Sequence, residues 1–166
     1  MKDGCEKKFF SSSEIDAWVD LYDTYALDYH DVFVTPSQKV YTSALSRAKR
    51  TAEYLELEYE ENALLNEVSA KAFIDTSWRF PKWLWFLGGR IYWATGRVKK
   101  SESKAETLKR ASAVVDIMIA SKEETIMIVS HGFFMWVLAK EFKKRGFVGE
   151  IDKHPKNGKP YTFLKA

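Results

Sequence analysis

The feature that most constrains the fold is a short, uninterrupted apolar segment in the second half of the chain. Residues 125–129, Thr-Ile-Met-Ile-Val, carry no charge, and such runs are typical of strands that are buried on both faces of a parallel sheet. The polar tripeptide Ser130-His131-Gly132 ends this run, and residues 133–144 have the composition of a helix. A buried strand that leads into a helix is the building unit of α/β folds with parallel strands.

Further helices and strands alternate along the rest of the chain. Helical spacing of apolar residues, with serine and acidic residues placed to cap the first turns, predicts helices over residues 11–26, 43–57 and 103–121. Short strands are predicted at residues 38–42 and, after an Asn-Gly turn, at residues 161–164. Residues 60–100 are expected to be rich in loops, with only weak helical pieces around the aromatic residues. The predicted fold class is a three-layer α/β/α sandwich with a largely parallel sheet, formed by a single domain over residues 1–166.

Composition excludes several classes of partner. The chain has 26 basic and 23 acidic residues, so we expect a surface of mixed charge with no basic field for nucleic acid. Cys5 is the only cysteine, which excludes an intrachain disulfide and a multi-cysteine metal site and fits the reducing cytoplasm. The aromatic-rich residues 78–93 are interrupted by Pro81 and Gly88-Gly89, so they fall short of the ~20 apolar residues that a membrane span requires. We therefore expect a cytoplasmic protein with neither nucleic acid nor membrane as a partner.

Two groups of polar residues follow predicted strands and begin predicted helices. The first is Ser43-Ala-Leu-Ser-Arg47, and the second is Ser130-His131-Gly132. In open α/β sheets, ligands bind at the carboxyl ends of the strands, and the amino end of a helix offers unpaired N–H groups and a positive dipole end to an anion. Arg47 would add a planar cation that binds phosphate oxygens in pairs. Both groups are therefore candidates for a phosphate site.

Three motifs, in order along the chain, resemble those of the histidine phosphatase (phosphoglycerate mutase-like) superfamily. Residues 42–52, Thr-Ser-Ala-Leu-Ser-Arg-Ala-Lys-Arg-Thr-Ala, are similar to its second signature, whose arginine binds the phosphoryl group. Leu65-Asn66-Glu67 resembles its Leu-x-Glu segment, and Val129-Ser-His131-Gly132 resembles its second catalytic histidine motif. The resemblance covers about residues 38–145. Each motif is short, but their combination, each on its expected element, is specific.

The resemblance implies metal-free phosphoryl transfer through a phosphohistidine, without a cofactor, on a small phosphorylated molecule. In this interpretation His131 is catalytic, and Glu67 is the candidate proton donor. The residues expected to bind the phosphate are Arg47, Ser43 and Gly132, and the candidates for the substrate pocket are Arg90 and Trp93. We favour a phosphatase over a mutase, because mutases of the superfamily have additional segments that close over the substrate and this chain has little room for them.

One motif of the superfamily has no counterpart in the 166 residues. The resemblance implies a first strand that ends in Arg-His-Gly, whose histidine attacks phosphorus. Residues 1–10 contain no histidine, and neither His30 nor His154 lies in a matching motif. Either the segment lies upstream of the first methionine or the lineage has lost it. The missing strand is expected between the strands that precede Ser43 and Ser130. Without it, the chain would have to close the gap, pair its strand edges in a homodimer or remain poorly soluble, and of these the homodimer is the least costly.

A second class of function stays open at this point. A non-catalytic domain that binds phosphorylated ligands or proteins would keep Arg47 and His131 without forming a covalent intermediate. The 166-residue chain itself is expected to be inactive as a phosphatase, because it lacks the nucleophile.

On the third predicted helix, Glu106 and Arg110 lie about one turn apart and are expected to form an exposed ion pair of little energetic consequence.

Overall fold

The computed structural model describes residues 7–27, 34–97 and 100–166, which fall into two compact units. The first unit consists of Met1–Asp28 and Val68–Glu106, and the second consists of Tyr29–Glu67 and Thr107–Ala166. Cys5 and His30 lie outside the described residues. The division reflects compactness and does not test whether the units fold independently, so a single domain remains a prediction.

A parallel sheet of three strands is the centre of the second unit. Its order is β3 (Glu60–Glu61), β2 (Lys39–Thr42) and β5 (Ile126–Val129). In the parallel register of β2 and β5, Lys39 lies opposite Ile126 and Thr42 lies opposite Val129. The sheet confirms the predicted α/β class, and β2 and β5 are each one residue shorter than predicted.

The strands before Ser43 and Ser130 are direct neighbours in the sheet, so the gap that the missing strand would leave between them is closed. Their N–H and C=O groups form one parallel ladder, and β3 covers the other edge of β2. The ladder continues past the strand ends, because the amide of Ser43 donates to the carbonyl of Val129 at 2.9 Å. The N–H and C=O groups of β2 and β5 that a missing strand would leave unpaired therefore bond to one another. A homodimer remains a prediction. An open strand edge between β2 and β5 no longer supports it, because the two strands pair with each other.

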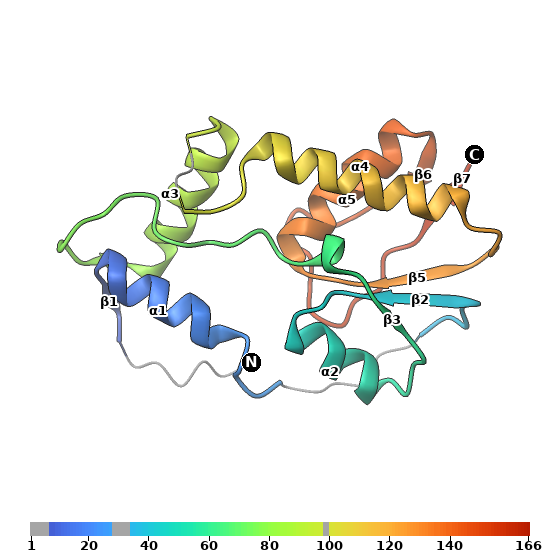
Figure 1. Cartoon of the computed structure of the whole chain (residues 1–166), viewed down its shortest axis with the longest axis horizontal. Helices are drawn as coiled ribbons and strands as arrows, with labels where there is room; N and C mark the ends of the chain where they lie inside the picture. Colours follow the sequence, from blue (N-terminus) through green and yellow to red (C-terminus); the bar gives the residue numbers. More distant parts are fainter. Residues whose placement is uncertain (1–6, 28–33, 98–99) are drawn as a thin grey trace. The chain divides into compact units, whose positions relative to one another are not determined.

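Three helices accompany this sheet: α2 (Ser46–Tyr54), α4 (Lys104–Ala120) and α5 (Gly132–Lys144). Figure 1 shows α2 on one side of β2 and β5, with α4 and α5 on the other side. The bounds of α4 and α5 agree with the predicted helices to within one residue. Their apolar faces and that of α2 supply most of the buried side chains of this unit, among them Ala48, Ala52, Val114, Val115, Phe134, Val137 and Leu138.

The second helix, α2, is shorter at both ends than the prediction over residues 43–57. It begins only at Ser46 because the segment before it is held in a turn, in which the amide of Leu45 donates to Ser43 Oγ at 3.2 Å. It ends at Tyr54, and Glu56 then adopts a left-handed φ of 52°, which a right-handed helix does not accommodate. The turn at its start places Ser43 outside the helix and leaves its hydroxyl available for other contacts.

An antiparallel hairpin of β6 (Phe147–Gly149) and β7 (Phe163–Lys165) ends the chain. The ring of Phe142 on α5 packs against it, with centroid distances of 5.1 Å to Phe147 and 5.7 Å to Phe163. The predicted turn is confirmed at Gly158, whose φ is 72°. The last strand begins two residues later than predicted, and β6 was not predicted because three residues are too short to show a period.

The first unit is built around aromatic side chains. Its elements are β1 (Phe9–Phe10), α1 (Ser12–Tyr22), β4 (Phe80–Pro81) and α3 (Lys82–Ala94), and β1 pairs with β4 in antiparallel register. Trp85 is completely buried, and its indole N–H donates to the carbonyl of Phe10 at 2.9 Å. The buried side chains that form the core of this unit are Phe10, Ile15, Trp18, Ala72 and Trp85.

Residues 66–79 form a loop as expected, and the 13-residue helix α3 is longer and more regular than the weak helical pieces expected around the aromatic residues. Aromatic residues occupy several faces of this helix and hide its period, and packing against the core stabilises it despite two central glycines. Gly88 has a specific reason to be glycine. A Cβ atom at this position would lie 2.1 Å from Cε1 of Phe73, so only a glycine lets the ring approach the helix.

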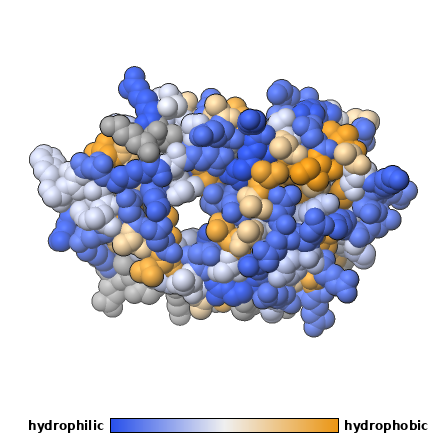
Figure 2. Space-filling model, viewed as in Figure 1, coloured by the Kyte–Doolittle hydropathy of each residue, from blue (hydrophilic) through white to orange (hydrophobic). Residues whose placement is uncertain are grey.

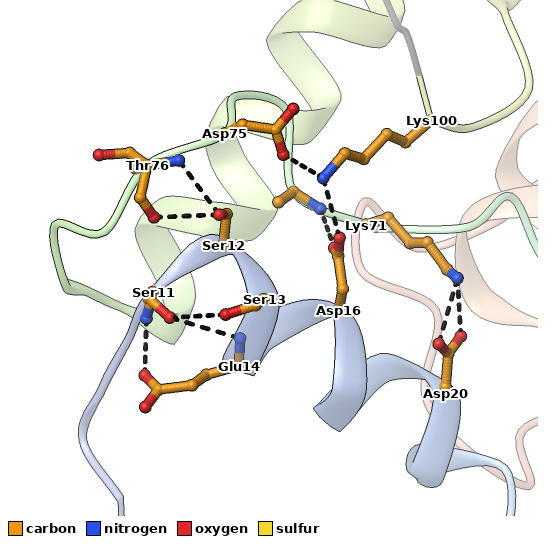
Figure 3. A network of polar contacts seen from close by, with 11 residues as sticks. Ser11, Ser12, Ser13, Glu14, Asp16, Asp20, Lys71, Asp75, Thr76 and Lys100 are labelled. Atoms are coloured by element: carbon orange, nitrogen blue, oxygen red, sulfur yellow. Dashed lines mark hydrogen bonds and ion pairs between the residues drawn. The ribbon is translucent and has the colours of Figure 1, made fainter.

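A polar network fastens the loop after residue 68 to α1 (Figure 3). The predicted capping box is present, because Glu14 accepts from the amide of Ser11 at 2.8 Å and the amide of Glu14 donates to Ser11 Oγ at 3.4 Å. Hydrogen bonds from Lys7 and from the Ser11 amide lower the pKa of Glu14 to about 2. Two positions further on, Asp16 accepts from the amide of Ala72 at 2.6 Å. The helix ends at Tyr22, four residues before its predicted end.

Apolar side chains also reach the surface of the molecule. Figure 2 shows small hydrophobic areas separated by hydrophilic residues on the face that it presents. The exposed large apolar residues include Trp78, Trp83, Leu87 and Ile91. None of the helices within the described ranges is long and apolar enough to cross a lipid bilayer.

Candidate functional site

Two of the motifs leave the parallel sheet at the same edge. Because Thr42 lies opposite Val129 in parallel register, the residues that follow them, Ser43 and Ser130, emerge side by side. The two helices that come next, α2 and α5, begin within three residues of these serines. The carboxyl edge of β2 and β5 therefore carries two helix starts and the polar side chains before them, as is typical of ligand sites in α/β sheets.

A hydrogen bond joins the two motifs directly. Nε2 of His131 lies 2.9 Å from Oγ of Ser43, although 88 positions separate the residues in the sequence. Ser43 is completely buried and His131 is 9% exposed, so water competes little with this contact. The backbone of His131 is also fixed, because its carbonyl accepts from the amide of Met135 at 2.8 Å in the first turn of α5. The structure thus brings together Ser43 and His131 from separate parts of the sequence.

Asn66 is the third member of this cluster. Its Oδ1 accepts from the hydroxyl of Ser43 at 2.8 Å and from the amide of Ala44 at 3.0 Å. The side chain therefore links the loop after β3 to the turn before α2. Sequence analysis did not select Asn66, although its place between Leu65 and Glu67 in the Leu-x-Glu segment was a signal that could have drawn attention to it.

Glu67 lies at the amino end of α5. Its two carboxylate oxygens accept from the amides of Phe133 at 3.2 Å and Phe134 at 3.0 Å. A carboxylate in this position stabilises a helix, because it pairs orphan N–H groups and complements the positive end of the helix dipole. Two of the amides that the sequence suggested for phosphate are thus bonded to Glu67, which has a structural role in this unit whatever its part in proton transfer.

Arg110 on α4 binds the loop that contains Asn66. Its Nη1 donates to the carbonyls of Leu64 at 2.7 Å and Asn66 at 2.6 Å, and its guanidinium carbon lies 4.0 Å from the ring centroid of Phe134. The prediction that Arg110 forms an exposed ion pair with Glu106 is therefore wrong. Arg110 is partly buried and binds the carbonyls of this loop. Glu106 instead binds the amide and hydroxyl of Ser103, at 2.8 and 2.7 Å, at the start of α4.

Arg47 and Gly132 occupy the starts of the two helices. Arg47 is the second residue of α2 and is partly buried, and its carbonyl accepts from the hydroxyl of Thr51 at 2.8 Å. Gly132 is the first residue of α5 and is exposed. A Cβ atom built on Gly132 would meet no heavy atom within 4 Å. Packing within the protein therefore does not require a glycine here, and the space beside its Cα is open.

Arg90 and Trp93, the candidates for a substrate pocket, belong to the first unit. Trp93 is buried, and Nη1 of Arg90 donates to the carbonyl of Val68 at 3.4 Å. Their part in the pocket remains a prediction. Among residues 7–27, 34–97 and 100–166, no group of three or more His, Cys, Asp or Glu side chains could hold a metal ion.

Comparison with protein families agrees with the motifs of this site. A profile of the histidine phosphatase superfamily (branch 1) matches residues 31–155, well over half of the chain. The chain therefore belongs to the histidine phosphatase superfamily. Membership implies chemistry of the phosphomonoesterase type and a phosphorylated ligand, and it leaves the substrate unspecified. No curated protein matches the sequence.

Solved structures from mycobacteria share the fold. The product of an open reading frame of Mycobacterium tuberculosis aligns at a TM-score of 0.51 and 17% identity, over 76% of this chain and 71% of that one. A mycobacterial glucosyl-3-phosphoglycerate phosphatase aligns at a TM-score of 0.50 and 16% identity, over 78% of this chain and 77% of that one. Mycobacterial hydrolase 2 aligns at a TM-score of 0.48 and 20% identity, over 64% of this chain, which spans only 52% of that structure. At these identities the likeness concerns the fold alone.

Proposed function

We propose that this chain carries the phosphate-binding and second-histidine part of a metal-independent phosphomonoesterase that acts on a small phosphorylated molecule. The observation that carries the proposal is the 2.9 Å contact between Ser43 and His131. It joins the arginine motif to the histidine motif at the carboxyl edge of β2 and β5, where an anion is favourably bound. The bonds of Ser43 with Asn66 and of Ser130 with Leu65 join the Leu-x-Glu segment to the same edge.

Each residue has a chemical role in this proposal. Arg47 binds two oxygens of the phosphoryl group as a planar fork. His131 donates a hydrogen bond that strengthens as negative charge moves onto those oxygens in the transition state. Glu67 is the proposed proton donor to the leaving alkoxide, in addition to its bonds with the start of α5. The open space beside Gly132 would admit the ligand close to the backbone.

The covalent step of the superfamily needs one more group. A bond forms between a histidine nitrogen and phosphorus while the bond from phosphorus to the leaving oxygen breaks, and water then releases phosphate from the histidine. None of the three histidines in the 166 residues lies in the Arg-His-Gly motif that would supply this nitrogen. The proposed role of this chain is therefore to bind and stabilise the phosphoryl group, with the nucleophile contributed by sequence outside these residues.

A second candidate function is a non-catalytic domain that binds phosphorylated ligands. The absence of Arg-His-Gly from the 166 residues favours it, and binding itself needs only Arg47 and His131, with Ser43 bonded to the ring of His131. Both candidates predict phosphate binding at one place, so they share the first test. They differ in turnover once an Arg-His-Gly segment is supplied.

Isothermal titration with inorganic phosphate tests the proposed site. We expect Arg47→Ala and His131→Ala each to weaken binding by roughly 10- to 150-fold, because a hydrogen bond to a charged group contributes about 1.5–3 kcal/mol. Arg50→Ala is the matched control: it removes the same charge three positions further along α2, where Arg50 is bonded to Ser46. If Arg50→Ala weakened binding as much as Arg47→Ala, the effect would come from net charge and the assignment of Arg47 would be wrong.

A further inference from the structure

The hydroxyl of Ser43 has three polar neighbours, and together they determine where its proton lies. They are Oδ1 of Asn66 at 2.8 Å, the amide of Leu45 at 3.2 Å and Nε2 of His131 at 2.9 Å. The amide of Leu45 can only donate. Oδ1 of Asn66 can only accept, and its identity as the oxygen follows from the amide of Ala44, which donates to the same atom at 3.0 Å.

This accounting assigns the proton on the imidazole. A hydroxyl has one proton to donate, and the Ser43 hydroxyl donates it to Asn66. Ser43 Oγ therefore meets Nε2 of His131 as an acceptor, and Nε2 must carry the hydrogen. In the neutral ring, Nδ1 is then the nitrogen without a proton, and it is the one that gains a proton when the ring becomes charged. The alternative tautomer would place two lone pairs against each other in a buried contact.

Asn66 is itself held in place by groups outside the cluster. Its carbonyl and that of Leu64 both accept from Nη1 of Arg110, at 2.6 and 2.7 Å. The hydroxyl of Ser130 donates to the carbonyl of Leu65 at 2.6 Å, which fastens the same loop to the residue before His131. The backbone is thus bonded at Asn66 and at the two residues before it. Its side-chain oxygen is presented to Ser43 by a fixed backbone, which is what a tautomer-selecting contact requires.

We propose that Asn66 is a positioning residue that selects the Nε2–H tautomer of His131 through the hydroxyl of Ser43. The selection leaves Nδ1 as the nitrogen that exchanges a proton, so the hydrogen bond proposed from His131 to a phosphoryl group comes from Nδ1 of the charged ring. The tautomer assignment holds without any enzymatic activity, and its use in binding a phosphoryl group rests on the proposed function. Asn66 is assigned no contact with the ligand.

Nitrogen-15 NMR of the histidine rings in the labelled 166-residue protein tests this inference. Spectra are recorded at about pH 8.5, roughly two units above the ordinary histidine pKa near 6.5, so that the ring is neutral. The His131 signals are identified by their absence from His131→Ala. We expect the wild-type ring to carry its proton on Nε2. Asn66→Ala should raise the Nδ1–H population several-fold, because the Ser43 hydroxyl is then free to donate to the ring.

Three further variants make the test specific. Asn66→Asp keeps an acceptor oxygen and should keep the Nε2–H tautomer. Ser43→Ala removes the hydroxyl that joins Asn66 to His131, so the preference for the Nε2–H tautomer should be lost. This variant keeps the inference testable if Asn66→Ala does not fold. Asn62→Ala is the matched control, because Asn62 Oδ1 accepts from the amide of Leu64 at 3.0 Å in the same loop without a bond to Ser43. It should leave the tautomer unchanged.

The inference is overturned by an Nδ1–H ring in the wild type, by a folded Asn66→Ala with an unchanged tautomer, or by an equal effect of Asn62→Ala. These outcomes are separate from those of the phosphate titration. A protein with the expected tautomers that does not bind phosphate would contradict the proposed function alone. A protein that binds phosphate with tautomers independent of Asn66 would contradict this inference alone.

Discussion

The 166-residue chain should hydrolyse p-nitrophenyl phosphate no faster than the uncatalysed background. It supplies groups that bind a phosphoryl group, but none of its three histidines lies in the Arg-His-Gly motif that the family uses for attack. Removing a covalent nucleophile costs on the order of a million-fold in well-studied enzymes. A polypeptide that also carries an Arg-His-Gly segment upstream of Met1 should therefore show turnover that the shorter chain lacks. Release of p-nitrophenolate measures both.

Two controls accompany the turnover measurement. Addition of a chelator should leave any activity unchanged, because the proposed chemistry uses no metal. His131→Ala in the longer polypeptide should lower activity strongly without affecting the fold. Robust activity of the 166-residue chain that His131→Ala abolishes and a chelator does not change would contradict the account. It would mean that His131 is itself the nucleophile.

Trp85→Ala should lower the free energy of unfolding of the protein by about 3–5 kcal/mol. Its indole is completely buried, packs at centroid distances of 5.3 Å from Phe73 and 5.6 Å from Phe80, and donates to the carbonyl of Phe10. Truncation would leave a cavity among rings that cannot collapse freely, and it would remove one hydrogen bond. A loss of this size is a large part of the usual 5–15 kcal/mol of a domain. Urea denaturation followed by circular dichroism measures it.

Trp83→Ala is the matched control for Trp85→Ala. Trp83 lies two positions earlier on the same helix and is 63% exposed, so its truncation should change stability by less than about 1 kcal/mol. The pair separates burial from the loss of a tryptophan as such. Equal losses for the two variants would show that the aromatic core does not hold this unit together as described.

The fold could be predicted from sequence where a period is strong or a motif is local. The apolar run of β5 and the spacing of α4 were sufficient to predict both elements to within one residue. The helix α3 could not be predicted, because aromatic side chains on several of its faces are stabilised by packing with α1 and the loop at Phe73, and these contacts are distant in sequence. The pairing of β2 with β5 is likewise a non-local choice that no single strand reveals.

In the candidate site, too, local motifs could be predicted and contacts between distant residues could not. The meeting of Ser43 and His131 at one edge of the sheet could be predicted because both lie in motifs at strand ends, and the role of Arg47 stays a prediction. The bonds of Glu67 to the start of α5, and those of Arg110 to the loop, could not be predicted, because each partner lies more than 40 positions away. An arginine one turn from a glutamate has the pattern of a surface pair, and only burial distinguishes it. Hydrogen-bond partners of this kind depend on the three-dimensional fold and leave no local signal.

The central claim is that the arginine and histidine motifs bind one phosphate group together. An NMR titration with inorganic phosphate that follows the side-chain Nε of Arg47 and the ring nitrogens of His131 in the same sample tests it most directly. The account predicts that both sets of signals shift along one saturation curve, while Nε of Arg50 is unaffected. Signals of His131 and Arg47 that followed different curves, or a shift of one without the other, would contradict a common site.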